Sequence, residues 1–206
     1  MKEESIYSEL ASIRSLMERS SKFISLSGLS GVLAGVYALA GAFYAQRLFQ
    51  QHEVGGHIPH GYVVHSGIVL QLVLIALAVL FLSISTCVIL SLRQSRKKGE
   101  ASWHPASQRL LTSIALPLIT GGIFIILLLL RAEYWLIIPA CLIFYGLALV
   151  SGSHYTFSDV RWLGVLEILL GLLCAWIPGS GLLFWIIGFG LLHILYGFIM
   201  HFKYKQ

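Results

Sequence analysis

Charged residues are scarce in this sequence. Asp, Glu, Lys and Arg together make up 11% of the chain, against roughly 25% in soluble globular domains. Hydrophobic residues make up 57%, and the mean hydropathy is +0.83. Too little polar sequence remains for a separate soluble domain, so the sequence predicts an all-α integral membrane protein.

The motifs of the common enzyme classes are also absent. The sequence has no P-loop, G-x-S-x-G, H-E-x-x-H or twin C-x-x-C pattern. Its three cysteines, Cys87, Cys141 and Cys174, lie in apolar runs and predict neither a disulfide framework nor a metal site. A haem with two axial histidines is not expected, because only His193 lies deep within an apolar run. We therefore expect a protein that is not an enzyme and has no cofactor.

Six apolar runs are long enough to cross a bilayer, for which about 20 helical residues suffice. They cover residues 24–46, 63–92, 110–130, 134–150, 159–177 and 182–202, approximately. Short connections pair them into three hairpins, so residues 24–206 are predicted to form a six-helix transmembrane bundle. Residues 1–23 precede the bundle and carry an apolar stripe at helical spacing, made of Ile6, Leu10, Ile13 and Met17. This stripe predicts an amphipathic helix, cytoplasmic or lying in the membrane interface.

The basic residues that flank the runs are distributed unevenly. One side of the predicted bundle carries twelve, namely Lys2, Arg14, Arg19, Lys22, Arg93, Arg96, Lys97, Lys98, Arg109, Arg161, Lys203 and Lys205. The other side carries only Arg47 and Arg131. Basic residues concentrate on the cytoplasmic side, so we expect a multi-pass protein of the plasma (inner) membrane with both termini in the cytoplasm. The net charge of +5 does not indicate nucleic-acid binding, because the basic residues lie between the apolar runs.

Small residues form faces on which helices can approach each other closely. The first run contains the G-x-x-x-G pair Gly31 and Gly35. Besides the lipid bilayer, this pair and the N-terminal helix are candidate contacts for a second copy or a membrane-protein partner. Two short resemblances suggest parallel repeats around an axis along the membrane normal. They match 144–146 (Phe-Tyr-Gly) with 195–197 (Leu-Tyr-Gly), and 31–34 (Gly-Val-Leu-Ala) with 164–167 (Gly-Val-Leu-Glu).

Glu167 is the only carboxylate within apolar sequence, and His193 is the lone deep histidine. At ~1.5 Å per helical residue, Glu167 lies roughly 12 Å and His193 roughly 13 Å from the same membrane face. Two antiparallel helices would bring them to one level, either as a neutral hydrogen-bonded pair or as an ion pair. Tyr145, Tyr196 and Tyr37 are candidates to complete an intramembrane polar centre.

A second group of histidines lies between the first two runs. His52, His57, His60 and His65 stand near Glu53, and such groups can hold zinc or copper. Their spacing matches no helical or finger arrangement. A solvated, pH-sensitive loop without metal is the expectation.

Two functions from different classes remain open. The expected one is a non-enzymatic scaffold, sensor or stress-related membrane component in which Glu167 and His193 hold helices together. The alternative is a proton-coupled transporter or channel for a small solute or ion that uses the same two residues. The layout of six short spans with the pattern Gly164-Val-Leu-Glu-Ile-Leu-Leu-Gly171 resembles small six-span proteins of bacterial inner membranes. It is loosely similar to the HdeD-like acid-resistance membrane proteins, and this resemblance implies a part in acid stress.

Overall fold

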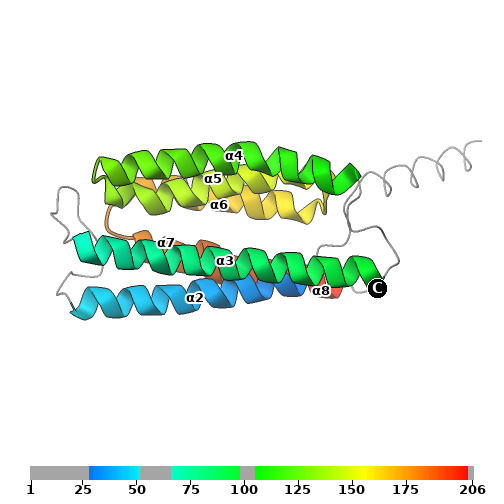
Figure 1. The fold of residues 1–206 in the computed structure, drawn as a ribbon, viewed down its shortest axis with the longest axis horizontal. Helices are drawn as coiled ribbons and strands as arrows, with labels where there is room; N and C mark the ends of the chain where they lie inside the picture. The colour runs from blue at the N-terminus through cyan, green and yellow to red at the C-terminus, as the bar shows by residue number, and fades with distance from the viewer. Residues whose placement is uncertain (1–27, 52–65, 98–104, 204–206) are drawn as a thin grey trace, which may run out of the picture.

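The computed structural model describes residues 28–51, 66–97 and 105–203. Every regular element within these ranges is helical, and none of them is a strand. The helices lie side by side in a bundle (Figure 1). The predicted all-helical fold is therefore confirmed. The predicted amphipathic helix at 1–23 and the histidine-containing segment at 52–65 lie outside the described residues.

The elements follow one another as long helices joined by short turns. They are α2 (Gly28–Gln51), α3 (Ser66–Lys97), α4 (Pro105–Leu130), η1 (Tyr134–Leu136), α5 (Ile137–Gly152), η2 (Ser153–Tyr155), α6 (Asp159–Trp176), α7 (Gly181–Trp185), η3 (Ile186–Leu192) and α8 (His193–Lys203). α7, η3 and α8 form one continuous segment, of which η3 is a π-helix. Five segments, including this composite one, are long and apolar enough to cross a membrane. The remaining helix, α6, has 18 residues and contains three charged side chains.

Helix ends differ from the predicted span ends by several residues. α3 continues through Arg93 and Arg96 to Lys97, and α4 begins at Pro105, five residues before the predicted span. Apolar sequence marks the part of a helix that lies in hydrocarbon, whereas the helix itself propagates for as long as each new residue adds a backbone hydrogen bond. The helices thus extend past the apolar runs into charged sequence.

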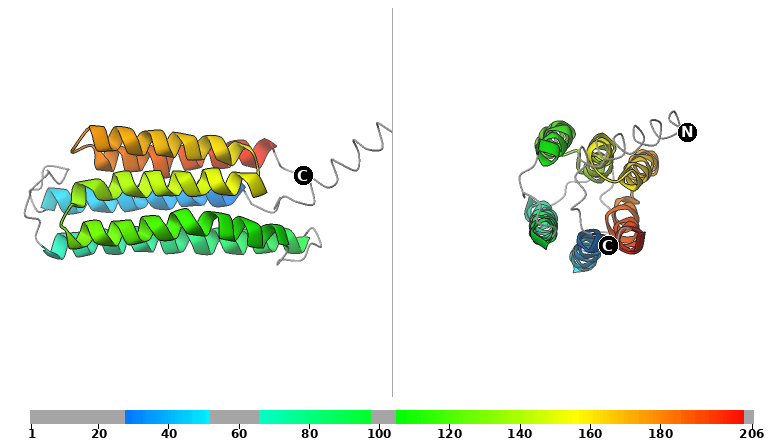
Figure 2. Two further views of the ribbon diagram at one scale, coloured as in Figure 1. Left: turned by 90° about the horizontal axis from the view of Figure 1, so that it is seen from above. Right: turned by 90° about the vertical axis from the view of Figure 1, so that its right-hand side faces the viewer.

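The helices are arranged as a ring when viewed along the bundle axis. The order around the ring is α3, α2, α7–α8, α6, α5 and α4 (Figure 2, right). α5 packs closely against α6, and α2 packs closely against η3 and α8. α3 packs mainly against α2, and α4 mainly against α5, so the ring is least tightly packed between α3 and α4. Large apolar side chains cover the outer faces of these two helices, among them Leu77, Phe81, Leu116 and Ile119.

Glycine contacts close the α5–α6 seam, the line along which these two helices touch. A Cβ atom placed on Gly146 would lie 2.6 Å from the carbonyl oxygen of Gly164, and one on Gly164 would lie 2.7 Å from that of Gly146. Two turns further along, a Cβ on Gly171 would lie 3.0 Å from the carbonyl oxygen of Pro139. The two backbones therefore touch directly, which is how small residues join helices in membranes.

The α2–α8 seam, which includes the contact of α2 with η3, is built in the same way. A Cβ on Gly28 would lie 2.7 Å from the carbonyl oxygen of Gly197, and one on Gly197 would lie 2.8 Å from that of Gly28. A Cβ on Gly35 would lie 2.6 Å from the carbonyl oxygen of Gly190. The face that carries Gly31 and Gly35 thus receives the last helical segment of the same chain. The predicted contact of this face with a second copy or a membrane-protein partner stays a prediction.

The two seams match position by position. Gly28, Gly35 and Gly197 take the places of Gly164, Gly171 and Gly146. The predicted match of 144–146 with 195–197 has this register. The predicted match of Gly31 with Gly164 is wrong by three residues, because Gly31 stands where α6 has Glu167. The shared letters Gly-Val-Leu arise from composition, whereas the true register is set by where backbones touch.

One exposed ion pair links the start of α6 to the end of α8. Ser158 directly precedes the first residue of α6, where a serine side chain can cap a helix. Its side chain nevertheless makes no capping hydrogen bond. Asp159 instead accepts from the Lys203 ammonium group at 2.8 and 3.1 Å.

Candidate functional site: a buried carboxyl group beside a π-helix

Glu167 lies in the middle of α6 and is completely buried, with an exposed fraction of 0%. The helix turns this side chain toward η3, and the carboxyl group lies against Gly188. A Cβ atom on Gly188 would lie 2.6 Å from Oε2 of Glu167 and 2.7 Å from Leu142 Cδ2. A larger residue at this position would have to displace the carboxyl group and the end of the Leu142 side chain.

The π-helix η3 supplies a backbone carbonyl group to the site. The backbone N–H of His193 donates to the carbonyl oxygen of Gly190. The carbonyl oxygen of Gly188 lies 3.0 Å from Nδ1 in the ring of His193. π-helical turns within α-helices are rare and occur frequently at functional sites. Here the wide turn exposes a carbonyl group to a side chain of its own helix.

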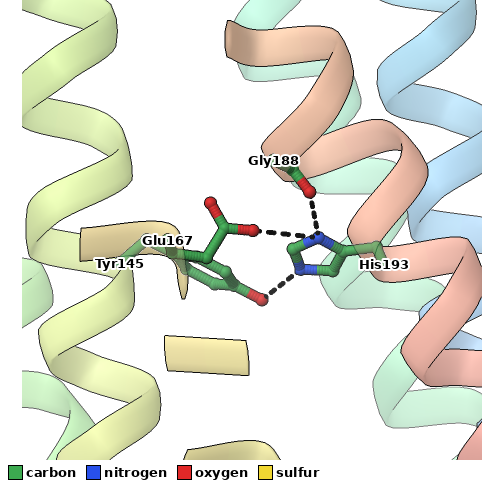
Figure 3. Close-up of polar contacts among 4 residues, drawn as sticks. All are labelled: Tyr145, Glu167, Gly188 and His193. Carbon is green, nitrogen blue, oxygen red and sulfur yellow. Dashed lines mark hydrogen bonds and ion pairs between the residues drawn. The ribbon is translucent and has the colours of Figure 1, made fainter. Parts of the chain in front are cut away.

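The hydrogen bonds of His193 identify the tautomer of its neutral ring. A carbonyl oxygen can only accept, so Nδ1 carries the proton and donates to Gly188. In the neutral ring Nε2 is then an acceptor, and the Tyr145 hydroxyl group donates to it over 2.7 Å. Tyr145 reaches His193 from α5, so this bond joins two helices (Figure 3).

The carboxyl group of Glu167 has no comparable partner. Its Oε1 atom is 3.5 Å from Nδ1 of His193, which is too long for a well-formed hydrogen bond. Neither oxygen makes a hydrogen bond with any residue that the structure describes. A buried polar group without a partner costs about 1–3 kcal/mol, and more if it is charged. The site therefore holds an acid that the fold does not satisfy.

Apolar and aromatic side chains surround the three polar groups. Phe189 packs against Tyr145 with tilted rings whose centroids are 5.4 Å apart, and in the same way against Trp185 at 4.7 Å. The indole N–H of Trp185 donates to the carbonyl oxygen of Ala38 on α2, at 3.2 Å. Leu142, Cys174 and Phe184 form a buried cluster on the same side of the bundle. Aromatic contacts thus run from Trp185 through Phe189 to the ring of His193, and the hydrogen bond of Trp185 attaches this row to α2.

The structure brings together three of the five predicted residues of the polar centre, namely Glu167, His193 and Tyr145. Tyr37 lies elsewhere and shares a 3.3 Å hydrogen bond with Thr86, which joins α2 to α3. Tyr196, one turn beyond His193, is half-buried and makes no hydrogen bond with another described residue.

Sequence reasoning missed Gly188, Phe189 and Trp185. The Gly188-Phe-Gly190 sequence could have indicated an irregular helix at Gly188, because two glycines separated by a single residue weaken the interior of an α-helix. No pattern indicates that the weakness becomes a π-helix rather than a kink. The aromatic pair gives no functional signal, since such residues are ordinary members of a membrane helix.

Metal binding finds no support in the described ranges. No group of three or more His, Cys, Asp or Glu side chains gathers there. The candidates His52, His57, His60 and His65 lie outside the described residues. What the described site can do chemically is gain and lose protons, through an acid, an imidazole and a phenol within contact distance.

Comparisons with known proteins give no match. No protein-family model matches the sequence, and neither the curated proteins nor the solved structures contain a significant relative.

Proposed function

We propose that the chain is a six-span inner-membrane protein of three hairpins, with both termini in the cytoplasm and an amphipathic helix before the first span. The twelve basic residues on one side, against two on the other, support this orientation. Cysteine labelling tests it. A cysteine at position 57 should react with an impermeant maleimide added outside the cell, and one at position 98 should not. Labelling of position 57 from the cytoplasmic side alone would contradict the topology.

We propose further that the protein acts as a non-enzymatic sensor, whose conformation depends on the proton carried by Glu167. One observation carries this proposal: the carboxyl group is completely buried, and neither oxygen has a hydrogen-bonding partner among the described residues. A charge at membrane depth costs at least ~2.5 kcal/mol. Gain or loss of one proton therefore changes the stability of the packing around Glu167 by an amount large enough to shift a conformation.

The π-helix gives the proton a way to act on the fold. Gly188 touches the carboxyl group on one side and accepts from His193 on the other. When Glu167 loses its proton, the new charge attracts Nδ1–H of His193, now 3.5 Å from Oε1. That attraction competes with the bond from Nδ1–H to the Gly188 carbonyl group. The two interactions compete for the same N–H group of His193. A change in their balance would change the hydrogen-bond register of η3.

Transport is less well supported by this geometry. Movement of an ion or solute requires polar groups along a path, but the apolar side chain of Leu142 lies beside the carboxyl group at Gly188. Leu142 belongs to a buried apolar cluster that also contains Cys174 and Phe184. A purely structural role is also less well supported, because a carboxyl group that bonds to nothing contributes little to holding helices together. A role in acid stress, implied by the HdeD-like resemblance, remains a prediction.

The test follows the fluorescence of Trp185 in a protein whose other tryptophans are replaced by Phe. Trp185 contacts Phe189, which lies between it and the site. In liposomes, we expect its emission to change between acidic and alkaline buffer. The change should vanish in Glu167→Gln, because an amide does not titrate. Glu133→Gln is the matched control: it removes a carboxylate in the α4–α5 turn and should leave the response intact.

A pH-sensitive dye inside the same liposomes separates sensing from transport. We expect no proton flux with the wild type or with Glu167→Gln. A flux that the wild type shows and Glu167→Gln lacks, at equal thermal stability, would establish the transporter instead. The absence of any pH response of Trp185 in the wild type would overturn the sensor.

A further inference from the structure

A cavity of about 180 Å³ lies inside the ring, toward the end where α2 finishes and α3 begins. Side chains of α2, α3, α5 and α7 line it, and the residues that matter most here are Gly41, Ala45, Leu72, Ala76, Cys141 and Trp185. An apolar cavity of roughly 150 Å³ in a protein core can take up benzene or xenon. The volume is therefore sufficient for a ligand.

Small side chains and loose packing create this cavity. α2 presents Gly41, Ala42 and Ala45, and α3 presents Ala76, so two neighbouring helices leave space between their faces. α3 packs mainly against α2 and not against α5 across the ring. The loosely packed part of the ring is thus also the part where the interior is unfilled.

The shape of the cavity favours a chain over a compact ring. On α2 its lining extends from Gly41 to Phe49, which is roughly 12 Å along the axis at ~1.5 Å per residue. The same volume spread over that length makes a narrow slot parallel to the helices. Almost all of the surface that faces the slot is apolar.

The cavity is continuous with the surface that faces lipid. The α3 residues Leu72 and Ala76, which line it, are only half-buried. Their neighbours Leu70, Leu74 and Leu77 are each more than half exposed. At the membrane-surface end, Tyr134 and Trp135 join the lining. These residue types concentrate where hydrocarbon meets headgroups, so the slot runs parallel to a lipid chain at the depth where such chains lie.

From this geometry we infer that the cavity is a binding site for one acyl chain of a bilayer phospholipid, held between α2, α3 and α5. The headgroup lies beside Tyr134 and Trp135, and the chain extends along the slot to Cys141 and Trp185. Nothing charged lines the cavity within the described residues, so the site selects for the hydrocarbon and not for the headgroup. This inference is independent of the proton sensor.

Quenching by brominated lipid tests the site, because bromine quenches tryptophan only at short range. The protein keeps Trp185 alone and is placed in bilayers of a phospholipid brominated along its chain. We expect strong quenching of Trp185. The variant Ala76→Phe fills the slot and should reduce the quenching at least twofold. Ala78→Phe is the matched control, since Ala78 is exposed on the same helix and lies outside the lining, and it should leave quenching unchanged.

A second variant guards against misfolding of Ala76→Phe. Leu72→Ala enlarges the slot without adding volume to the bundle and should increase the quenching. Equal quenching in all variants would overturn the inference, because it would mean that the bromine reaches Trp185 from outside the slot. Absence of quenching in the parent protein would also overturn it, because no lipid chain would then reach the cavity.

Discussion

The α5–α6 and α2–α8 seams are two versions of one contact. In each, three glycines bring two antiparallel backbones into direct touch, and the carbonyl oxygens that a Cβ atom would meet belong to matching residues. The seams differ where Glu167 stands in α6 and Gly31 in α2. A Cβ on Gly31 would meet only the backbone of α8, 3.3 Å from Gly197 Cα.

The difference shows that a seam of this type closes without a carboxyl group. Gly31 packs against α8 with nothing polar between the helices, whereas Glu167 occupies the matching position and is left without a hydrogen bond to any described residue. If packing alone determined the residue, a small or apolar one would serve α6 as well. The acid is therefore an addition to the fold, which is what a functional group at membrane depth is expected to be.

The largest effect should come from disrupting the glycine contacts that the two seams share. Gly146→Ala and Gly197→Ala each place a methyl group within 2.9 Å of backbone atoms, and overpacking of this kind costs about 1–3 kcal/mol. Both variants should lower the thermal unfolding temperature in detergent by similar amounts. Gly122→Ala is the control, because a Cβ there has nothing within 4 Å. A seam that tolerates its alanine would show that the two contacts are not equivalent.

The acid itself gives the next largest effect, and its sign is the informative part. Glu167→Leu replaces an unpaired buried carboxyl group by an apolar side chain of similar size. The α2–α8 seam likewise has no polar side chain at the matching position, where Gly31 stands. Removing the unsatisfied group should stabilise the fold by about 1–3 kcal/mol. The free energy of unfolding in mixed micelles measures this. A loss of stability would mean that Glu167 holds helices together after all.

Much of this comparison was accessible from the sequence. The rise of an α-helix placed Glu167 and His193 at one level, with Tyr145 as a candidate neighbour, and the structure brings these three together. Depth says nothing of direction around a helix axis, however, and for that reason Tyr37 and Tyr196 were candidates that the structure leaves outside the site. Of the two predicted repeat matches, 144–146 with 195–197 has the register of the seams and the match of Gly31 with Gly164 does not. Sequence alone could not tell them apart, since apolar sequence repeats short words by chance.

The remaining part of the site was not predictable from a pattern. Whether Gly188 and Gly190 make a kink, a break or a π-helix depends on the side chains that pack around them. Here these include Glu167 on α6 and Leu39 on α2. Both contacts arise from helices far away in sequence, so local reasoning can locate the weak point of the helix but not its shape.

A third prediction uses the tyrosines at matching positions of α5 and α8. Tyr145→Phe removes the 2.7 Å bond to His193 and should cost about 0.6 kcal/mol, the average for a hydrogen bond between membrane helices. Tyr196→Phe, at the equivalent place in α8, removes a hydroxyl group without a described partner and should cost nothing measurable. Thermal unfolding of the two variants side by side checks the difference. Equal losses would indicate that the hydroxyl group of Tyr196 is bonded outside the described residues.

The smallest effect concerns the ion pair between Asp159 and Lys203. This pair joins α6, which belongs to one seam, to α8, which belongs to the other. Lys203 is 54% exposed, and exposed pairs contribute about 0–1 kcal/mol. Lys203→Met keeps the apolar stem of the side chain but removes the charge, so it should lower stability by at most that amount. The difference from wild type should shrink as salt is raised, because the screening length falls from about 8 Å at physiological ionic strength to about 3 Å at 1 M. Lys203→Arg restores the charge and should behave as wild type at every salt concentration. A loss that persists in high salt would assign the effect to packing of the stem, and the two seams would then be joined by apolar contact rather than by charge.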